Sequence, residues 1–342
     1  MLSYYRCKWA VLHSFGGKGG SFVINRELNQ QDLVGRHGQP DGRLNRRTFL
    51  KAAGFGAAAG VAVSVVPAWA KDVPPKKRWR MRLSTSSIHF MQLSIEQACE
   101  RIAKLGFEAI DIWSAHEGCP HLDDVAKRLE PEGLKKLLAK HKLKLFAFSV
   151  YRGGYASYAE LLGKAGGGVA VQGSTGPCKP DELTARMRQF IESLKPLVEL
   201  AEKYNSYLAI ENHGNALLNS LDSFKAFVDI NTSPRLGIAL APYHLQTLKA
   251  SVPEAIRICG KRLFFFYAWQ HYPGSKQLPG VGPTDMTPWI RALADIRYRR
   301  YVNPFMHGHP EADVMSANLA KSRDYLKACC EKMNVKRGFI IS

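Results

Sequence analysis

Short apolar runs alternate along the chain with longer stretches that have the period of an amphipathic helix. The predicted strands are Met81 to Ser86, Ala109 to Trp113, Leu143 to Val150, Gly168 to Gln172, Tyr207 to His213, Leu236 to Ala241, Leu263 to Trp269 and Tyr301 to Met306. The predicted helices between them include Ser94 to Leu105, Glu130 to His141, Asp181 to Tyr204, Ser223 to Asp229 and Val314 to Met333. Repeated strand–helix units of this kind predict a parallel sheet.

Eight strands within about 250 residues are typical of a closed (β/α)8 TIM barrel. We expect a single barrel domain over residues 81–333, preceded by a Pro- and Lys-rich linker at 71–80 and followed by a tail at 334–342. No GxGxxG motif follows the first strand, so a dinucleotide-binding sheet is not favoured.

The segment 45–70 has the parts of a twin-arginine signal peptide in their usual order. Arg46 and Arg47 precede a weakly apolar stretch, Ala52 to Val66, which ends in Ala68-Trp69-Ala70. The stretch is shorter than the roughly 20 apolar residues of a stable membrane anchor. We therefore expect the twin-arginine machinery to export the protein, and the signal to be removed, in a bacterial periplasm or beyond. Residues 1–44 are expected to be disordered, or to reflect a start codon assigned too far upstream.

The chain is strongly basic, with 48 Lys and Arg against 29 Asp and Glu. Without residues 1–70 the net charge is still +13. Such charge attracts nucleic acid or an anionic envelope surface. No nucleic-acid-binding motif accompanies it, so we do not expect a nucleic-acid partner.

Polar residues follow the apolar strands at the end where a barrel places its chemistry. Glu211 and His213 end the fifth strand, two residues apart, and therefore point to the same side. A Glu at the end of a buried strand is destabilising unless it is paired or bound to a cation, which indicates a role in the site.

Histidines recur at the other strand ends, after the second, sixth, seventh and eighth strands. Together they predict a polar pocket suited to metal binding or acid/base chemistry. We expect Glu211, His213 and His244 to be catalytic. Substrate-binding residues are predicted at the remaining windows: His116, His121, Trp113, Tyr267, Trp269, Gln270, His307 and His309. The aromatic members are suited to stacking on sugar faces.

Three segments together resemble the xylose isomerase-like barrels, the group of sugar phosphate isomerases and epimerases that includes relatives of endonuclease IV. These segments are Ala103 to Trp113, Ile210 to His213 and Pro242 to His244. The resemblance covers Met81 to about Met333 and agrees with the barrel predicted above.

The resemblance implies a divalent metal (Mn, Mg, Zn or Co), held by carboxylates and histidines at the ends of strands five to eight. It also implies proton exchange by two Glu beside a substrate carbonyl. Glu211 falls on the fifth-strand Glu, and His244 on the His after the sixth-strand Asp; both are the implied metal ligands. That Asp is replaced by Ala241, Tyr267 stands at the seventh-strand His position, and residues 303–306 contain no Glu.

The sequence is compatible with three functions. The first is an isomerase, epimerase or keto-glycoside lyase acting on a sugar or keto-sugar. The second is a non-catalytic sugar-binding barrel. The third is a nuclease akin to endonuclease IV, whose dense set of zinc ligands this sequence does not contain. Export favours free carbohydrates over sugar phosphates as the small-molecule partner.

Overall fold

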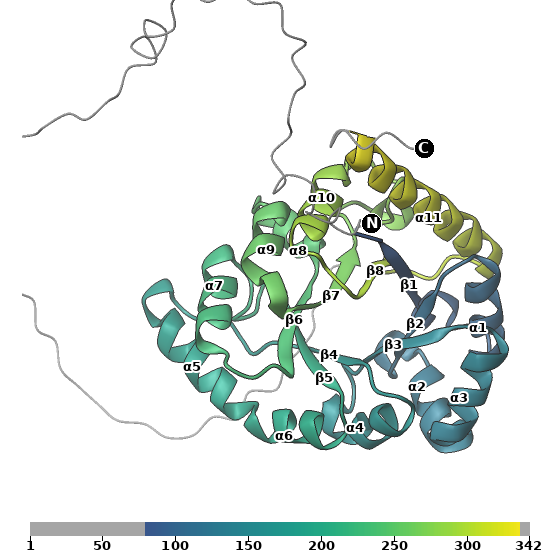
Figure 1. Cartoon of the computed structure of the whole chain (residues 1–342), viewed down its shortest axis with the longest axis horizontal. Helices are drawn as coiled ribbons and strands as arrows, with labels where there is room; N and C mark the ends of the chain where they lie inside the picture. Colours follow the sequence, from purple (N-terminus) through teal and green to yellow (C-terminus); the bar gives the residue numbers. More distant parts are fainter. Residues whose placement is uncertain (1–78, 336–342) are drawn as a thin grey trace, which may run out of the picture. The chain divides into compact units, whose positions relative to one another are not determined.

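The computed structural model describes residues 79–335, and this part of the chain forms a closed barrel of eight parallel strands (Figure 1). The strands are β1 (Arg82–Ser86), β2 (Ala109–Trp113), β3 (Lys144–Ser149), β4 (Val169–Gly173), β5 (Tyr207–Glu211), β6 (Leu236–Leu240), β7 (Leu263–Ala268) and β8 (Tyr301–Pro304). Each strand pairs with the next in sequence, which confirms the predicted (β/α)8 TIM barrel.

Helices follow the strands and surround the barrel (Figure 1). The α-helices are α1 (Ile95–Lys104), α2 (His121–Asp124), α3 (Glu130–Lys140), α4 (Gly154–Lys164), α5 (Leu183–Ser193), α6 (Lys195–Lys203), α7 (Leu221–Ile230), α8 (Pro242–Thr247), α9 (Val252–Cys259), α10 (Thr287–Asp295) and α11 (Ala312–Val335). Ser94 caps α1 in a capping box with Gln97.

Closure depends on the pairing of β8 with β1. Arg82 lies opposite Tyr301, and Leu83 lies opposite Val302. Because all eight strands are parallel, their carboxyl ends meet at one end of the barrel and their amino ends at the other. The residues after the strands are thereby gathered from segments far apart in sequence.

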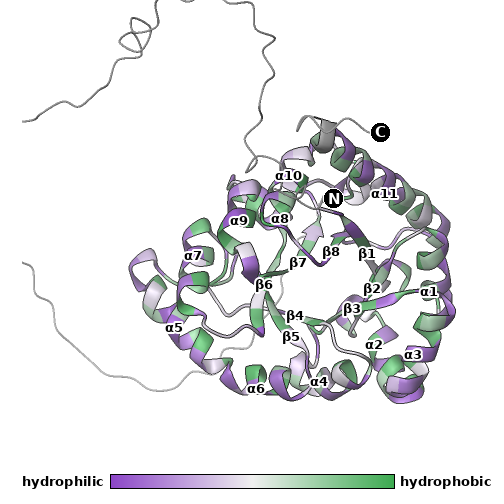
Figure 2. Cartoon of the chain, in the orientation of Figure 1, coloured by the Kyte–Doolittle hydropathy of each residue, from purple (hydrophilic) through white to green (hydrophobic). Residues whose placement is uncertain are grey.

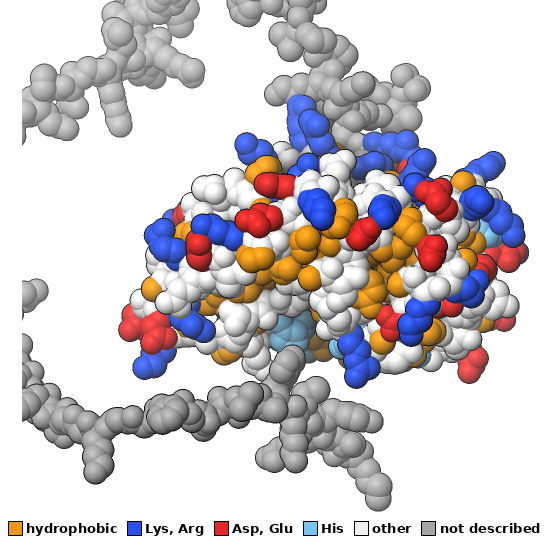
Figure 3. Space-filling view, turned by 90° about the horizontal axis from the view of Figure 1, so that it is seen from below, with side chains coloured by type: hydrophobic (Ala, Val, Ile, Leu, Met, Phe, Trp, Pro, Cys, Tyr) orange, Lys and Arg blue, Asp and Glu red, His pale blue; other side chains and the backbone are white. Residues whose placement is uncertain are grey.

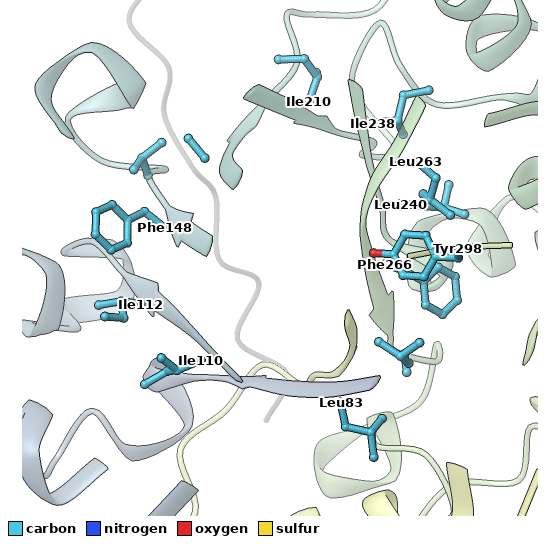
Figure 4. Close-up of a cluster of buried hydrophobic side chains, with 14 of the residues drawn as sticks. Leu83, Ile110, Ile112, Phe148, Ile210, Ile238, Leu240, Leu263, Phe266 and Tyr298 are labelled. Atoms are coloured by element: carbon cyan, nitrogen blue, oxygen red, sulfur yellow. The ribbon is translucent and has the colours of Figure 1, made fainter. Parts of the chain in front are cut away.

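Two apolar layers hold the barrel. Outward side chains of the strands, such as Ile110, Phe148 and Leu240, pack against the helices (Figure 4), and the helices turn apolar residues toward them (Figure 2). The barrel interior is filled by small residues together with aromatic ones, including Phe146, which stacks on Phe265 at 4.7 Å between ring centroids. Alternating side-chain directions along each strand produce this division.

The structure differs from the sequence prediction at one long helix. The predicted helix from Asp181 to Tyr204 is two helices, α5 and α6, separated at Leu194. Pro196 lies in the first turn of α6, where its missing N–H is tolerated, whereas inside a continuous helix its ring would clash with the preceding turn.

The predicted signal peptide at 45–70 and the extension before it lie outside the described residues. Within 79–335, no helix is both long enough and apolar enough to cross a bilayer.

Gly237 of β6 predicts a local limit on side-chain size. A Cβ at this position would lie 2.5 Å from the ring of Phe264 and 2.6 Å from the carbonyl oxygen of Arg262. We expect Gly237→Ala to lower the free energy of unfolding by about 1–3 kcal/mol, measured by urea denaturation. Gly176→Ala is the matched control because a Cβ there meets nothing within 4 Å. Equal stability of the two variants would contradict the tight packing of β6 on β7.

Candidate active site

A cavity of about 310 Å³ opens at the carboxyl ends of the strands. Its lining residues are Trp113, His116, Tyr151, Glu211, His213, Tyr243, His244, Trp269, Gln277, Phe305 and His307. Two larger hollows, of about 500 and 410 Å³, border α1 on the outside of the barrel. We place the site in the smaller cavity because strand ends from around the barrel converge there.

Glu211, the last residue of β5, forms the acidic wall of the cavity. The Tyr151 hydroxyl donates to its Oε2 at 2.5 Å, and the Tyr267 hydroxyl lies 3.0 Å from that of Tyr151. Burial raises the pKa of Glu211 to about 7, and the hydrogen bond from Tyr151 opposes this rise. Burial also raises the pKa of both phenols well above the ordinary value, so both remain protonated at neutral pH.

His213 and His244 form the wall beside Glu211. Their ring centroids are 4.0 Å apart, and His244 packs edge-on against Trp269 at 5.3 Å. Burial, together with the neighbouring histidines, lowers the pKa of His244 to about 3. Burial also lowers the pKa of His213. Both rings are therefore neutral at pH 7, and each can donate one N–H and accept at its other nitrogen.

Asn212 fixes this wall by joining the ends of β5 and β6. Its Nδ2 donates to the carbonyl of Ala241 at 3.1 Å, and its Oδ1 accepts from the Ala241 N–H at 2.7 Å. The side chain is fully buried. A two-point amide clamp of this kind holds Glu211 and the helix that bears His244 in a fixed relation.

Trp113 forms the opposite wall, stacked on Phe305 with 5.2 Å between ring centroids. Its indole N–H donates to Oδ2 of Asp111 at 2.6 Å. Ser86 and Ser149 also donate to this buried carboxylate, at 2.8 and 3.0 Å. Burial raises the pKa of Asp111 to about 6, while these hydrogen bonds favour its charged form. Asp111 thus orients an aromatic wall from beneath the cavity.

Trp269 and Tyr243 form a second aromatic pair, stacked with ring centroids 4.3 Å apart. Gln277 joins this pair to the loop after β8. Its Oε1 accepts from Trp269 Nε1 at 2.7 Å and from the His307 N–H at 3.1 Å. The cavity therefore has flat apolar surfaces on two sides and hydrogen-bonding groups between them.

The rim is closed by Glu117, which lies in the loop after β2. Its Oε1 is 2.9 Å from His307 Nδ1, and its Oε2 is 2.9 Å from His309 Nε2. The His307 contact, followed by the charges of neighbouring histidines, lowers the pKa of Glu117 to about 2 despite partial burial. The loops after β2 and β8 are thus joined across the mouth.

The structure brings together most of the residues that the sequence predicts for the site. Those that line the cavity are Trp113, His116, Glu211, His213, His244, Trp269 and His307. Four others lie elsewhere. Tyr267 is buried behind Tyr151. Gln270 is buried and donates to the Leu278 carbonyl. His121 is buried with Nε2 3.0 Å from the Leu93 carbonyl oxygen. His309 lies at the rim.

Sequence reasoning did not single out Tyr151, Gln277, Phe305 or Asp111. Phe305 directly follows β8, and Tyr151 lies two residues after the end of β3, so position at a strand end is the available signal for both. Asp111 lies two residues before Trp113 in β2, on the same side of the strand, which is the available signal for a partner of the indole. Gln277 lies in a long loop, and no local pattern identifies it.

The residues present do not form the metal site that the resemblance implies. The methyl group of Ala241 has no donor atom, and the Tyr267 hydroxyl is hydrogen-bonded to Tyr151. Among the described residues, no group of three or more His, Cys, Asp or Glu is arranged to hold a metal ion. Glu211 and His244 are the remaining members of the implied set, and two donors do not complete a coordination shell.

Residues 99–329 match the xylose isomerase-like TIM barrel family, and the chain belongs to it. The match spans most of the barrel and contains every strand end that lines the cavity. No curated protein matches the chain by sequence.

Solved structures with the same fold include three informative neighbours. The first is a xylose isomerase-like TIM barrel/4-hydroxyphenylpyruvate dioxygenase fusion protein, with TM-score 0.60 and 18% identity over 77% of this chain and 45% of that chain. The second is the 3-keto-D-glucoside 4-epimerase YcjR from E. coli, with TM-score 0.56 and 16% identity over 72% and 100%. The third is the IOLI protein with a bound zinc atom, with TM-score 0.59 and 16% identity over 74% and 99%. The chain thus spans less than half of the fusion protein.

The raised pKa of Glu211 predicts that this side chain destabilises the fold when it is ionised. Because its pKa rises from 4.5 to about 7 on folding, the free energy of unfolding should fall between these pH values and stay low above them. We expect Glu211→Gln to be more stable than the parent at pH 8 by about 2–3 kcal/mol, and nearly equal to it at pH 4. Chemical denaturation at both pH values tests this.

Glu199→Gln is the control, because Glu199 is exposed on α6 and its substitution should change stability little at either pH. A Glu211→Gln variant that is no more stable at pH 8 would contradict a buried, costly carboxylate.

Proposed function

We propose that the protein transfers a proton at a carbon beside the carbonyl of a sugar or keto-sugar, as isomerases and epimerases do. The main support is Glu211, a carboxylate with a pKa of about 7 that faces a cavity walled by aromatic rings. A general base works best when its pKa lies near the working pH. One fold neighbour, the 3-keto-D-glucoside 4-epimerase, supports the same class of reaction.

The proposed step uses residues of this chain alone. The Glu211 carboxylate takes the proton, the C–H bond breaks, and its electron pair forms a C=C bond while the carbonyl oxygen becomes an enolate oxygen. Tyr151 holds the carboxylate in place through its 2.5 Å hydrogen bond. The N–H groups of the neutral His213 and His244 are suited to donate to the enolate oxygen. Delivery of the proton to the former carbonyl carbon, together with transfer of the neighbouring hydroxyl proton to the enolate oxygen, completes an isomerisation. Delivery of a proton from water to the opposite face of the original carbon completes an epimerisation, and Glu211 then loses its proton to solvent.

An uncharged carbohydrate fits the cavity better than a sugar phosphate. The residues that line the cavity include no Lys or Arg, although the chain carries 48 of them. The pKa of three histidines of the lining, His116, His213 and His244, is lowered, which favours their neutral form. Glu211 is the only carboxylate among the lining residues. Stacked pairs such as Trp113–Phe305 and Tyr243–Trp269 provide the apolar faces on which sugar rings pack.

Solvent exchange tests the reaction directly. Keto-sugars, including 3-keto-glucosides, are incubated with the full chain in D2O, and deuterium at the carbon beside the carbonyl is followed by NMR. We expect exchange to increase as the pH rises through about 7, because the base must be deprotonated. Glu211→Gln should slow exchange by roughly 10²- to 10⁴-fold. Phosphate esters of the same sugars should exchange poorly.

Two controls separate the alternatives. If the parent protein binds sugar but shows no exchange, and Glu211→Gln binds sugar equally well, the protein is a non-catalytic sugar-binding barrel. Exchange that is lost on chelation and restored by Mn²⁺, Mg²⁺, Zn²⁺ or Co²⁺ would indicate a metal held by Glu211 and His244, and would contradict the metal-independent step. Product analysis distinguishes isomerisation from a lyase reaction, since elimination also begins with removal of this proton.

We also propose that the protein acts after export by the twin-arginine pathway. The support is the sequence of residues 45–70, in which the parts of the signal follow one another in the usual order, and the absence of Lys and Arg from the residues that line the cavity. Replacing Arg46 and Arg47 together by Lys should leave the protein in the cytoplasm, as fractionation and immunoblotting would show. Replacing Arg36 and Arg43 by Lys is the matched control and should not affect export. Unchanged export of the Arg46/Arg47 variant would refute the proposal.

A further inference from the structure

The two ends of the barrel differ in charge. Exposed basic residues cluster in the connections that precede the strands or at the first residue of a strand: Lys142, Lys144, Lys261, Arg297 and Arg299. Among the described residues, Glu108 is the single acidic residue in these helix-to-strand connections, and it pairs with Arg80 at 2.9 Å. We call this end of the barrel the basic face.

The opposite end, around the cavity, has no such bias. Its loops carry both signs, for example Glu117, Glu182 and Glu311 beside Lys179 and Lys276. Figure 3 shows Lys and Arg side chains gathered along the upper edge of the barrel, with histidine visible at the lower edge. Much of the positive charge is therefore concentrated away from the site.

Two half-buried arginines extend the basic face toward the barrel axis. The guanidinium carbon of Arg82 lies 4.5 Å from the ring centroid of Tyr301, and that of Arg300 lies 4.2 Å from Tyr207 and 4.6 Å from Phe264. Within residues 79–335, neither arginine forms an ion pair with an acidic side chain. Aromatic rings orient these cations without neutralising them, so their charge adds to the field of this end.

The shape and composition of the basic face identify the kind of partner. The helix-to-strand connections after the first strand are only three to five residues long, so no helix or ribbon projects to enter the groove of a nucleic-acid duplex. Within residues 79–335, the exposed large apolar residues Leu248, Tyr272 and Val314 all lie at the other end, so this part of the chain gives the basic face no apolar centre of the kind that protein interfaces have.

We propose that the basic face docks electrostatically on the surface of an anionic lipid bilayer, leaving the cavity mouth directed away from it. A broad, low face with dispersed cations and no apolar anchor suits a flat array of anionic headgroups. Binding of this kind is peripheral and reversible, and it weakens as salt screens the charges. It is independent of the proposed reaction, because none of the residues of the basic face lines the cavity.

Vesicle sedimentation tests the proposal with the full chain. The probes are vesicles of phosphatidylcholine with about 30% phosphatidylglycerol, and vesicles of phosphatidylcholine alone. We expect binding to the anionic vesicles only, and its loss at about 1 M salt. The triple variant Lys142→Glu, Lys144→Glu, Arg299→Glu should bind at least ~10-fold more weakly. These side chains are exposed, so the variant should retain the fold and the parent's level of deuterium exchange.

The matched control reverses the same number of charges at the other end: Lys179→Glu, Lys249→Glu and Lys276→Glu, all exposed. It should bind within ~3-fold of the parent. Equal loss in both triple variants would show that only net charge matters, and equal retention would assign binding to another segment; either result overturns the proposal. A DNA duplex that displaces the protein from vesicles at equal phosphate concentration would assign the face to nucleic acid and would also overturn it.

Discussion

Parallel closure of the eight strands determines where the residues of the site lie. Pairing of β8 with β1 satisfies both edges of the sheet, and it places every strand's carboxyl end at the same end of the barrel. Glu211 from β5, Trp113 from β2 and Trp269 from the end of β7 become neighbours only because of this closure. Closure brings the strand ends close together, and hydrogen bonds such as those from Asn212 to Ala241 and from Trp269 to Gln277 then fix the distances between them.

The site combines neutral hydrogen-bond donors with the carboxylate of Glu211, whose burial disfavours its charged form. Burial raises the pKa of Glu211, and the hydrogen bond from Tyr151 and the charge of His307 oppose this rise only in part. The neighbouring His213 and His244 are neutral. Such an arrangement lowers stability, and under the proposed function it supplies a base that is half ionised near neutral pH. The resemblance implies a metal at this end of the barrel. Ala241 and Tyr267 stand at two of the implied donor positions, and the Tyr267 hydroxyl lies 3.0 Å from that of Tyr151.

The sequence predicts the fold well because its main signal, alternating short apolar runs and helical periods, is repeated in every unit. It predicts helix boundaries less well: Pro196 splits one long helix, since a helical period alone does not reveal a break between two helices in line. Of the residues that the strand-end rule predicts, Glu211, His213 and His244 line the cavity. Gln270 and His121 do not line it, because a polar side chain near a strand end can equally contact a backbone carbonyl, as both of these do. Contacts such as that of Gln277 with Trp269 and His307 depend on the path of a long loop, which no periodicity encodes.

The separation of the two barrel ends has a consequence for how such a protein changes over time. The helix-to-strand connections that hold Lys142 and Arg299 and the strand-to-helix loops that hold His116 and His307 are different stretches of chain, with the full length of a strand between them. A substitution in a helix-to-strand connection therefore leaves the residues of the strand-to-helix loops unchanged, and the reverse also holds. The surface charge of one end can therefore change during evolution without altering the cavity. The cavity can likewise change without altering that charge.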